Sequence, residues 1–258
     1  MFVYTFENIG NIKNLKHSDS IKPKHRRKIK RIKEGLFANF DYSEFKDKKP
    51  PKNESLQTYN ELKSLQKLPQ DIQFVKDKDI IEKVFEGVCE RYGVKFPTEM
   101  VEKLLLDSSG IILDLKFHHN RPRPGKLAKE YNMKIAEVIL SSMKTPSYPS
   151  GHSAQGYLVG LYLAEKFDDE KLGKELIAEA KAISKARNIG RAHYPSDSKV
   201  GEELGTKMFR YIKKDIENKE VIDLYNSAKT KAPNGSDKID AEIVDDMDDQ
   251  LPEKVLSS

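Results

Sequence analysis

Cationic and imidazole side chains are concentrated in three short segments whose spacing suits the binding of an anion. The first segment is Lys116-Phe-His-His-Asn-Arg-Pro-Arg-Pro124. Its prolines restrict the preceding backbone and hold both arginines on an extended chain. Guanidinium groups match phosphate oxygens bidentately, and Lys116 adds a compact charge. Taken alone, the segment also fits a basic surface loop. His118 and His119 do not indicate a metal site, because adjacent side chains point to different faces.

The second segment, Ser147-Tyr-Pro-Ser-Gly-His152, is typical of a tight loop that leads into the first turn of a helix. The first backbone N–H groups of a helix lack intrahelical partners and carry partial positive charge, so they can hold an anion. Ser150 adds a hydroxyl group. His152, with an ordinary pKa of about 6.5, could donate a proton near neutral pH. Without the other segments, a simple turn beside a helix-terminal histidine explains the same residues.

The third segment runs from Arg187 to Asp197 and combines an arginine, a histidine and a carboxylate. Arg187 continues the three-and-four spacing of the apolar residues before it, so it is expected to point inward. A carboxylate or a bound anion must then compensate its charge. His193 stands where Pro195 is expected to end the helix. Asp197 could hold one ring nitrogen of His193 and leave the other as a nucleophile or base, although His193 could instead cap helix carbonyls.

Together the three segments supply the groups needed for phosphoryl transfer through a phosphohistidine. His193 would attack phosphorus, His152 would protonate the departing alkoxide, and water would then hydrolyse the intermediate. Lys116, Arg123 and Arg187 would neutralise the equatorial oxygens, a task that metal ions perform in many phosphoryl-transfer enzymes.

The segments resemble, in the same order, the motifs of the type 2 phosphatidic acid phosphatase (PAP2) superfamily, which includes bacterial class A acid phosphatases and vanadium haloperoxidases. The motifs are K-x6-RP, PSGH and SR-x5-H-x3-D, and the likeness covers roughly residues 100 to 205. The resemblance is strongest to the soluble acid phosphatases. It implies a helical bundle and a metal-independent phosphomonoesterase, acid phosphatase-like, that hydrolyses small soluble phosphate esters. The implied roles are catalytic for His193 (nucleophile), His152 (general acid) and Asp197 (orienting carboxylate), and substrate-binding for Lys116, Arg123, Ser150, Gly151 and Arg187.

Two alternatives to this function stay open at the level of sequence. Vanadate is a shape analogue of phosphate, so the same residues would suit a vanadium-dependent haloperoxidase, although the chain is short for that group. Vanadate would be a cofactor in that case and an inhibitor of a phosphatase, which would need no cofactor. The second alternative is a non-catalytic protein that binds anions or nucleic acid. Both histidines and Asp197 argue against it, because anion binding needs only the cations and the loop.

The third motif departs from the family pattern at one position. Ala186 stands where the motif has serine, which removes a hydroxyl group but no charge.

Helical periodicity dominates the rest of the chain and predicts an all-α fold, a bundle of the acid phosphatase and haloperoxidase type with flexible N- and C-terminal tails. Residues 125–146 lie between two proline-containing loops and could be helical or extended. Three helices are expected after His152. Those expected before the first motif run from Asn53 to Pro69, from an Asp79 N-cap to Gly93, and onward from Thr98.

The 258 residues carry a formal net charge of +5 that is unevenly distributed. The predicted domains are a partly ordered N-terminal basic arm (1–52), a helical phosphatase domain (53–230) and an acidic disordered tail (231–258). The basic run between Lys22 and Lys33 has no interleaved aromatic residues, which argues against nucleic acid as a partner and favours a solvated or tail-pairing segment.

No stretch approaches the ~18 continuous apolar residues of a membrane span, and the N-terminus lacks the pattern of a secretion signal. A cytoplasmic protein without a membrane partner is therefore expected. Its expected ligand is a small phosphorylated substrate, and a homo-oligomer stays open. Cys89 is the single cysteine, so no intrachain disulfide can form, and it is expected in the core.

Overall fold

The computed structural model describes residues 6–216, and over this range the chain is helical with no β-strand, which confirms the all-α prediction. The predicted acidic tail and the last residues of the predicted 53–230 domain lie outside the described part. The elements are α1 (Phe6–Asn14), α2 (Pro23–Lys30), the 3-10 helix η1 (Arg31–Glu34), α3 (Ser43–Asp47), α4 (Leu56–Lys67), α5 (Ile72–Asp77), α6 (Ile81–Arg91), α7 (Thr98–His119), α8 (Pro124–Glu130), η2 (Ser141–Lys144), α9 (Gly151–Phe167), α10 (Glu170–Ile189) and α11 (Pro195–Ile216). No described helix combines the length and apolar character needed to cross a membrane.

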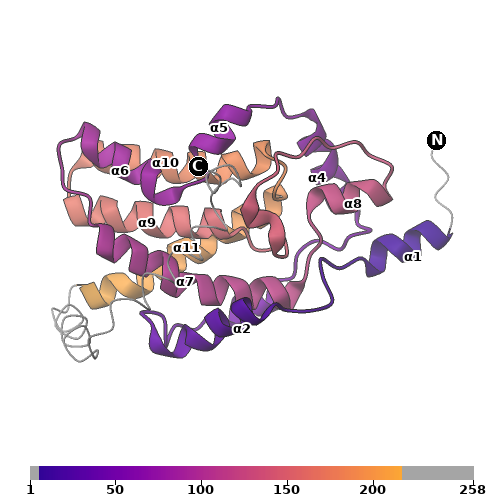
Figure 1. Ribbon diagram of the computed structural model, residues 1–258, viewed down its shortest axis with the longest axis horizontal. Helices are drawn as coiled ribbons and strands as arrows, with labels where there is room; N and C mark the ends of the chain where they lie inside the picture. Colours follow the sequence, from indigo (N-terminus) through magenta and orange to yellow (C-terminus); the bar gives the residue numbers. More distant parts are fainter. Residues whose placement is uncertain (1–5, 217–258) are drawn as a thin grey trace, which may run out of the picture.

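Helix α9 is the centre of the bundle, with α10 on one side of it and α7 on the other (Figure 1). It packs most extensively against α10 and α11. Small residues permit this close approach: a Cβ atom at Gly205 of α11 would collide with the backbone of Ala154 in α9. The starts of these two helices meet, so that the N–H of Ser150 donates to the carbonyl oxygen of Asp197 at 3.0 Å.

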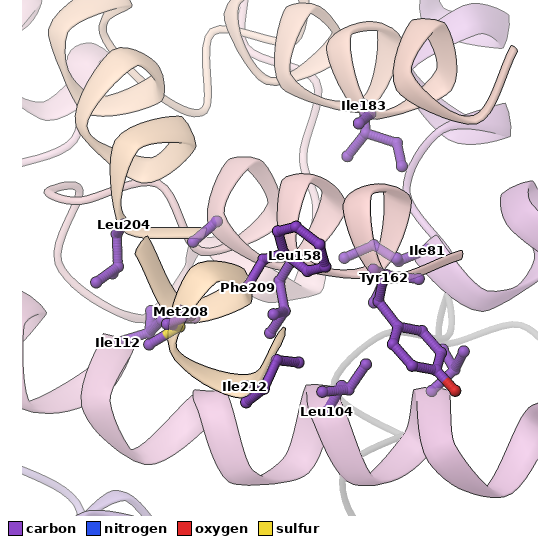
Figure 2. Packing of buried hydrophobic residues seen from close by; sticks show 14 of the residues in the cluster. Ile81, Leu104, Ile112, Leu158, Tyr162, Ile183, Leu204, Met208, Phe209 and Ile212 are labelled. Carbon is purple, nitrogen blue, oxygen red and sulfur yellow. The ribbon is translucent and has the colours of Figure 1, made fainter. Parts of the chain in front are cut away.

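The main apolar core lies between α7, α9 and α11, and α6 and α10 close it (Figure 2). Burying each large aliphatic or aromatic side chain of this kind contributes roughly 1.5–3 kcal/mol, so the core fixes the helices that carry the polar motifs at their ends. Cys89 is buried, as expected. Residues shown in Figure 2 include Leu104 and Ile112 of α7, Leu158 and Tyr162 of α9, and Leu204, Met208, Phe209 and Ile212 of α11.

The segment that the sequence assigns to an N-terminal arm is largely helical and contributes to this core. Helix α2 packs along α7, and most cations of the basic run face solvent. Phe37, Phe40 and Phe45 are buried in the same cluster as the central helices. These aromatic residues lie in the segment that the sequence assigns to the arm, and only Phe45 belongs to a helix, α3.

Several predicted boundaries are confirmed. Helix α7 begins at Thr98 and continues through Gly110, and Gly93 follows α6 with a positive φ of 64°. Residues 125–146 resolve into the short helix α8, a non-helical stretch and η2.

Two predicted helix ends are wrong. Pro195 begins α11 and does not end α10, which stops at Ile189, because proline suits the first turn of a helix. Asp79 does not cap α6 either: Ile80 is the N-cap residue, with no side-chain cap. The Asp79 carboxylate instead forms an ion pair with Arg187.

Candidate anion-binding site

The eight residues selected from the sequence converge at the ends of five helices. Lys116 lies in the last turn of α7, Arg123 directly before α8, and Arg187 in the last turn of α10. Ser150, Gly151 and His152 form the start of α9, His193 lies in the loop after α10, and Asp197 is in the first turn of α11. All are buried except Gly151, which is half-buried. The structure therefore brings all eight together, although their segments are far apart in the sequence.

Lys116 and Arg123 are buried cations that form no ion pair with any carboxylate of the described chain. The Lys116 ammonium donates to the carbonyl oxygen of Pro146 at 2.8 Å, and the Arg123 Nε donates to that of Thr145 at 2.8 Å. Burial, reinforced by Arg123, lowers the pKa of Lys116 well below its ordinary value. Burial and the Arg187 charge lower the pKa of Arg123 to about 9. An anion placed here would compensate a charge that the protein leaves unbalanced.

Arg187 points into the same region, as its position in the apolar stripe predicts. Of the two partners left open by the sequence, the structure provides the carboxylate: Asp79 accepts from Nη1. Nη2 donates to the hydroxyl oxygen of Ser142 at 2.9 Å. Nε is buried and has no hydrogen-bond partner among the described residues. Arg187 therefore retains one N–H that a bound oxyanion could satisfy.

The hydrogen bonds around His193 fix which ring nitrogen carries the proton. Arg123 Nη1 lies 3.0 Å from His193 Nε2, and a guanidinium group can only donate, so Nε2 is the acceptor. The proton is then on Nδ1, which lies 3.3 Å from a carboxylate oxygen of Asp197. Burial and the charge of Arg123 lower the pKa of His193 well below 6.5. At neutral pH His193 is thus an uncharged imidazole with its Nε2 lone pair directed toward a cation.

Asp197 holds more than His193. One of its oxygens accepts from Arg121 Nη1 at 2.6 Å, and the other accepts from the Ser147 hydroxyl and from the N–H of Tyr194 at 3.1 Å. Burial would raise the pKa of Asp197, but the Arg121 charge and the bonds from His193 and Ser147 keep it below its ordinary value. Asp197 is therefore a fixed, ionised acceptor for Nδ1.

Arg121, which the sequence motifs do not select as a phosphate ligand, has a different role in this arrangement. It binds Asp197 and, at 3.0 Å, Glu61 of α4, and its guanidinium stacks 3.7 Å above the Tyr194 ring. Helix α8 begins directly after Arg123, so the backbone changes direction there. The Arg121 and Arg123 side chains therefore reach different partners. Arg121 thus supports the carboxylate behind His193.

Asp79 is the second residue that sequence reasoning misses. Besides Arg187, it contacts His152, whose Nε2 lies 3.0 Å from its carbonyl oxygen and 3.3 Å from its carboxylate. Burial and the Arg187 charge lower the pKa of His152, whereas Asp79 raises it. The only sequence signal was the need of a buried Arg187 for a counter-charge, which does not single out one of 41 acidic residues.

Ser150 is the N-cap residue of α9, as the loop pattern predicts. Its Oγ accepts from the N–H of Ser153 at 3.3 Å and from the Ser153 hydroxyl at 2.8 Å. The hydrogen of the Ser150 hydroxyl is left to donate elsewhere, and the first N–H groups of α9 lie beside it. A helix start, an uncharged histidine and three cations thus surround one region.

No family model matches this sequence, and no curated protein is similar to it at a significant level. The function is therefore inferred from the site itself. Among residues 6–216, no group of three or more His, Cys, Asp or Glu side chains is arranged to hold a metal ion. The arrangement does bring together three cations, a helix start, the unprotonated Nε2 of His193 and a second imidazole, His152, a set of groups that suits a multiply charged oxyanion.

Proposed function

We propose that the protein is a phosphomonoesterase of the PAP2 type, which hydrolyses small phosphate esters through a phosphohistidine intermediate. One observation carries the proposal: Lys116 and Arg123 are buried without carboxylate partners, and Arg123 donates to the lone pair of His193 Nε2. Structural cations are normally paired when buried, so this excess of charge favours an anionic ligand. The ligand would lie beside a nucleophile that is already in the required tautomer.

Binding of the phosphate group would replace existing contacts of the cations. All of the Arg123 N–H groups have acceptors, and the one donated to His193 Nε2 is best placed for exchange with a phosphate oxygen. That exchange leaves the phosphorus next to Nε2. Lys116 and the free Nε–H of Arg187 would hold other oxygens, and the Gly151 end of α9 would add its helix N-terminal charge.

The reaction would then proceed in two displacements. The Nε2 lone pair of His193 forms the P–N bond while the ester P–O bond breaks, and His152 gives its proton to the departing alkoxide. The imidazole becomes cationic as it attacks, and the Asp197 carboxylate stabilises that charge through Nδ1–H. Water next attacks phosphorus and loses a proton to His152, which releases inorganic phosphate and restores both histidines.

Hydrolysis of p-nitrophenyl phosphate in EDTA, measured from pH 4 to 9 with and without vanadate, tests this proposal. We expect turnover that vanadate inhibits, because vanadate would occupy the same cations, and that His193→Ala abolishes. Absence of turnover at every pH would contradict a phosphatase, and oxidation of halide by peroxide in the presence of vanadate would then support the haloperoxidase alternative. Activity lost in EDTA and restored by a divalent metal would contradict the metal-free mechanism.

The pH profile follows from the two histidines. His152 must be protonated at the start, and its pKa lies below 6.5, so the active fraction grows as the pH falls. His193 must be unprotonated, and its pKa lies well below 6.5, so it remains a nucleophile in weak acid. We therefore expect kcat/KM to rise from pH 8 downward and to continue rising below pH 6.5. A plateau that begins above pH 6.5 would contradict these assignments.

Asp79→Asn provides the matched comparison for that profile. The Asp79 carboxylate raises the pKa of His152, so its removal should move the alkaline limb of the profile to lower pH and decrease kcat/KM at pH 7. Arg187 would lose its counter-charge, so inorganic phosphate should inhibit the variant more strongly. The second ionisation of the substrate, near pH 6, is common to both proteins and cancels in the comparison.

A further inference from the structure

Residues 15–18, between α1 and α2, form a strap that crosses the structure beside Arg123. The N–H of His17 donates to the carbonyl oxygen of Asn120 at 3.1 Å, and the Asn120 side chain exchanges two hydrogen bonds with the backbone of Ser18. Lys126 of α8 donates to the carbonyl oxygens of Lys16 and His17 at 2.7 and 3.0 Å. Asn120 lies three residues before Arg123, and Lys126 lies three residues after it. Hydrogen bonds therefore hold the strap on both sides of Arg123, one of the cations of the proposed phosphate site.

The His17 ring contacts the same loop that binds the cations. Its Nε2 lies 3.3 Å from the carbonyl oxygen of Lys144. The carbonyl oxygens of the next two residues, Thr145 and Pro146, accept from Arg123 and Lys116. Three successive carbonyl groups thus bring the His17 imidazole and two site cations to one stretch of backbone.

His17 is an uncharged imidazole at neutral pH. Burial, together with the charges of Arg123, Lys116 and Lys126, lowers its pKa to about 4, although the hydrogen bond to Lys144 acts in the opposite direction. With its proton on Nε2 and donated to the Lys144 carbonyl, the ring has a bare lone pair on Nδ1. Nδ1 is buried, and no described residue donates to it. Because buried acceptors are normally paired, this nitrogen suits a donor that arrives with a ligand.

The chemistry of that donor can be narrowed. A phosphate dianion offers only acceptor oxygens, so it cannot pair with Nδ1 of a neutral imidazole. A hydroxyl group can, and in a phosphate monoester such a group belongs to the alcohol part. An ammonium group on the ligand is disfavoured because the positive charges of Arg123, Lys116 and Lys126 near the ring would repel it.

We propose that His17 is a specificity-determining residue, whose Nδ1 accepts a hydrogen bond from a hydroxyl group on the alcohol part of the substrate. The favoured substrates are then phosphate monoesters of polyhydroxy alcohols, such as glycerol or sugars. This inference rests on the proposed phosphomonoesterase function, because it takes the cations beside His17 as the phosphate site. Because Nδ1 is covered by protein, the strap would have to move enough to admit the hydroxyl group.

Binding of two phosphonates that cannot be hydrolysed tests the inference without any need for turnover. Calorimetry at pH 7 compares butylphosphonate with 3,4-dihydroxybutylphosphonate on the full chain. We expect the wild type to bind the dihydroxy compound about tenfold more tightly, as one additional buried hydrogen bond would allow. His17→Phe should lose this preference by weakening only the dihydroxy ligand.

Two further variants make the result specific. His17→Asn places an amide oxygen near the position of Nδ1, so it should retain part of the preference. His118→Ala removes an exposed histidine of α7 and should behave as the wild type. Equal binding of both phosphonates by the wild type, or equal weakening of both by His17→Phe, would overturn the inference.

The outcomes separate this inference from the proposed function. A wild type that prefers the dihydroxy phosphonate but hydrolyses no phosphate ester would support the role of His17 and overturn the phosphatase. A wild type that binds neither phosphonate would overturn both. Hydrolysis without a hydroxyl preference would overturn only the role of His17.

Discussion

Replacing His193 with alanine should lower kcat for phosphate ester hydrolysis by at least about a thousandfold, the scale seen when a covalent nucleophile is removed. Among the described histidines, His193 is the one whose unprotonated Nε2 contacts a site cation, Arg123, whereas the Nε2 of His152 is turned to Asp79. His118 is an exposed histidine, so the control substitution His118→Ala should leave kcat unaltered.

The inhibition constant of inorganic phosphate distinguishes this loss from a damaged site. Arg123 Nη1 donates to His193 Nε2, so the alanine variant frees that N–H for a phosphate oxygen. Phosphate should therefore bind the variant at least as tightly as it binds the wild type while kcat falls. Rapid quenching in alkali should trap phosphate on the wild type only. A variant that keeps the wild-type kcat, or that loses phosphate binding in parallel, would contradict the assignment of the nucleophile.

The positions of the site residues were predictable because each is tied to a local pattern. Arg187 belongs to an apolar stripe and Ser150 to a helix start. Pro195 marks a helix boundary near His193, although it begins α11 and does not end α10 as predicted. These patterns determine direction and element within a few residues. They place the candidate site residues at or near helix ends, and these ends meet in the structure.

The partners behind these residues were not predictable in the same way. Asp79 precedes an apolar run and has the sequence context of an N-cap, but the free energy of pairing a buried arginine outweighs a cap of about 1 kcal/mol. Arg121 and Arg123 have the same chemistry two residues apart, and only the entry into α8 separates them. His17 reaches the site from a segment with no local signal at all. Such long-range pairings depend on the tertiary packing of helices, which single-sequence periodicity does not contain.

Replacing Asp197 with asparagine should damage both the stability and the chemistry of the site. The asparagine amide would orient its carbonyl oxygen toward the Arg121 guanidinium, which can only donate hydrogen bonds. Its NH2 group would then face the N–H of Tyr194 and Nδ1 of His193. A donor then opposes a donor at Tyr194. Loss of the buried charge partner should cost about 3 kcal/mol, the lower end for a broken buried pair, because Glu61 still binds Arg121. Urea denaturation measures this change.

The chemical effect of the same substitution arises from the tautomer. An NH2 group at position 197 donates to His193 Nδ1, which moves the imidazole proton to Nε2 and removes the attacking lone pair. In a Ser-His-Asp triad, where a carboxylate orients a histidine in the same way, the Asp→Asn substitution lowers kcat about ten-thousandfold. The double variant Arg121→Met/Asp197→Asn separates the two effects. Methionine removes the Arg121 charge that has lost Asp197, but Glu61 then loses its own partner and the donor-donor contact at Tyr194 persists, so stability should recover only in part. In contrast, kcat should stay low because no carboxylate stabilises the cationic imidazole. A recovery of kcat in the double variant would show that Asp197 acts only as the partner of Arg121.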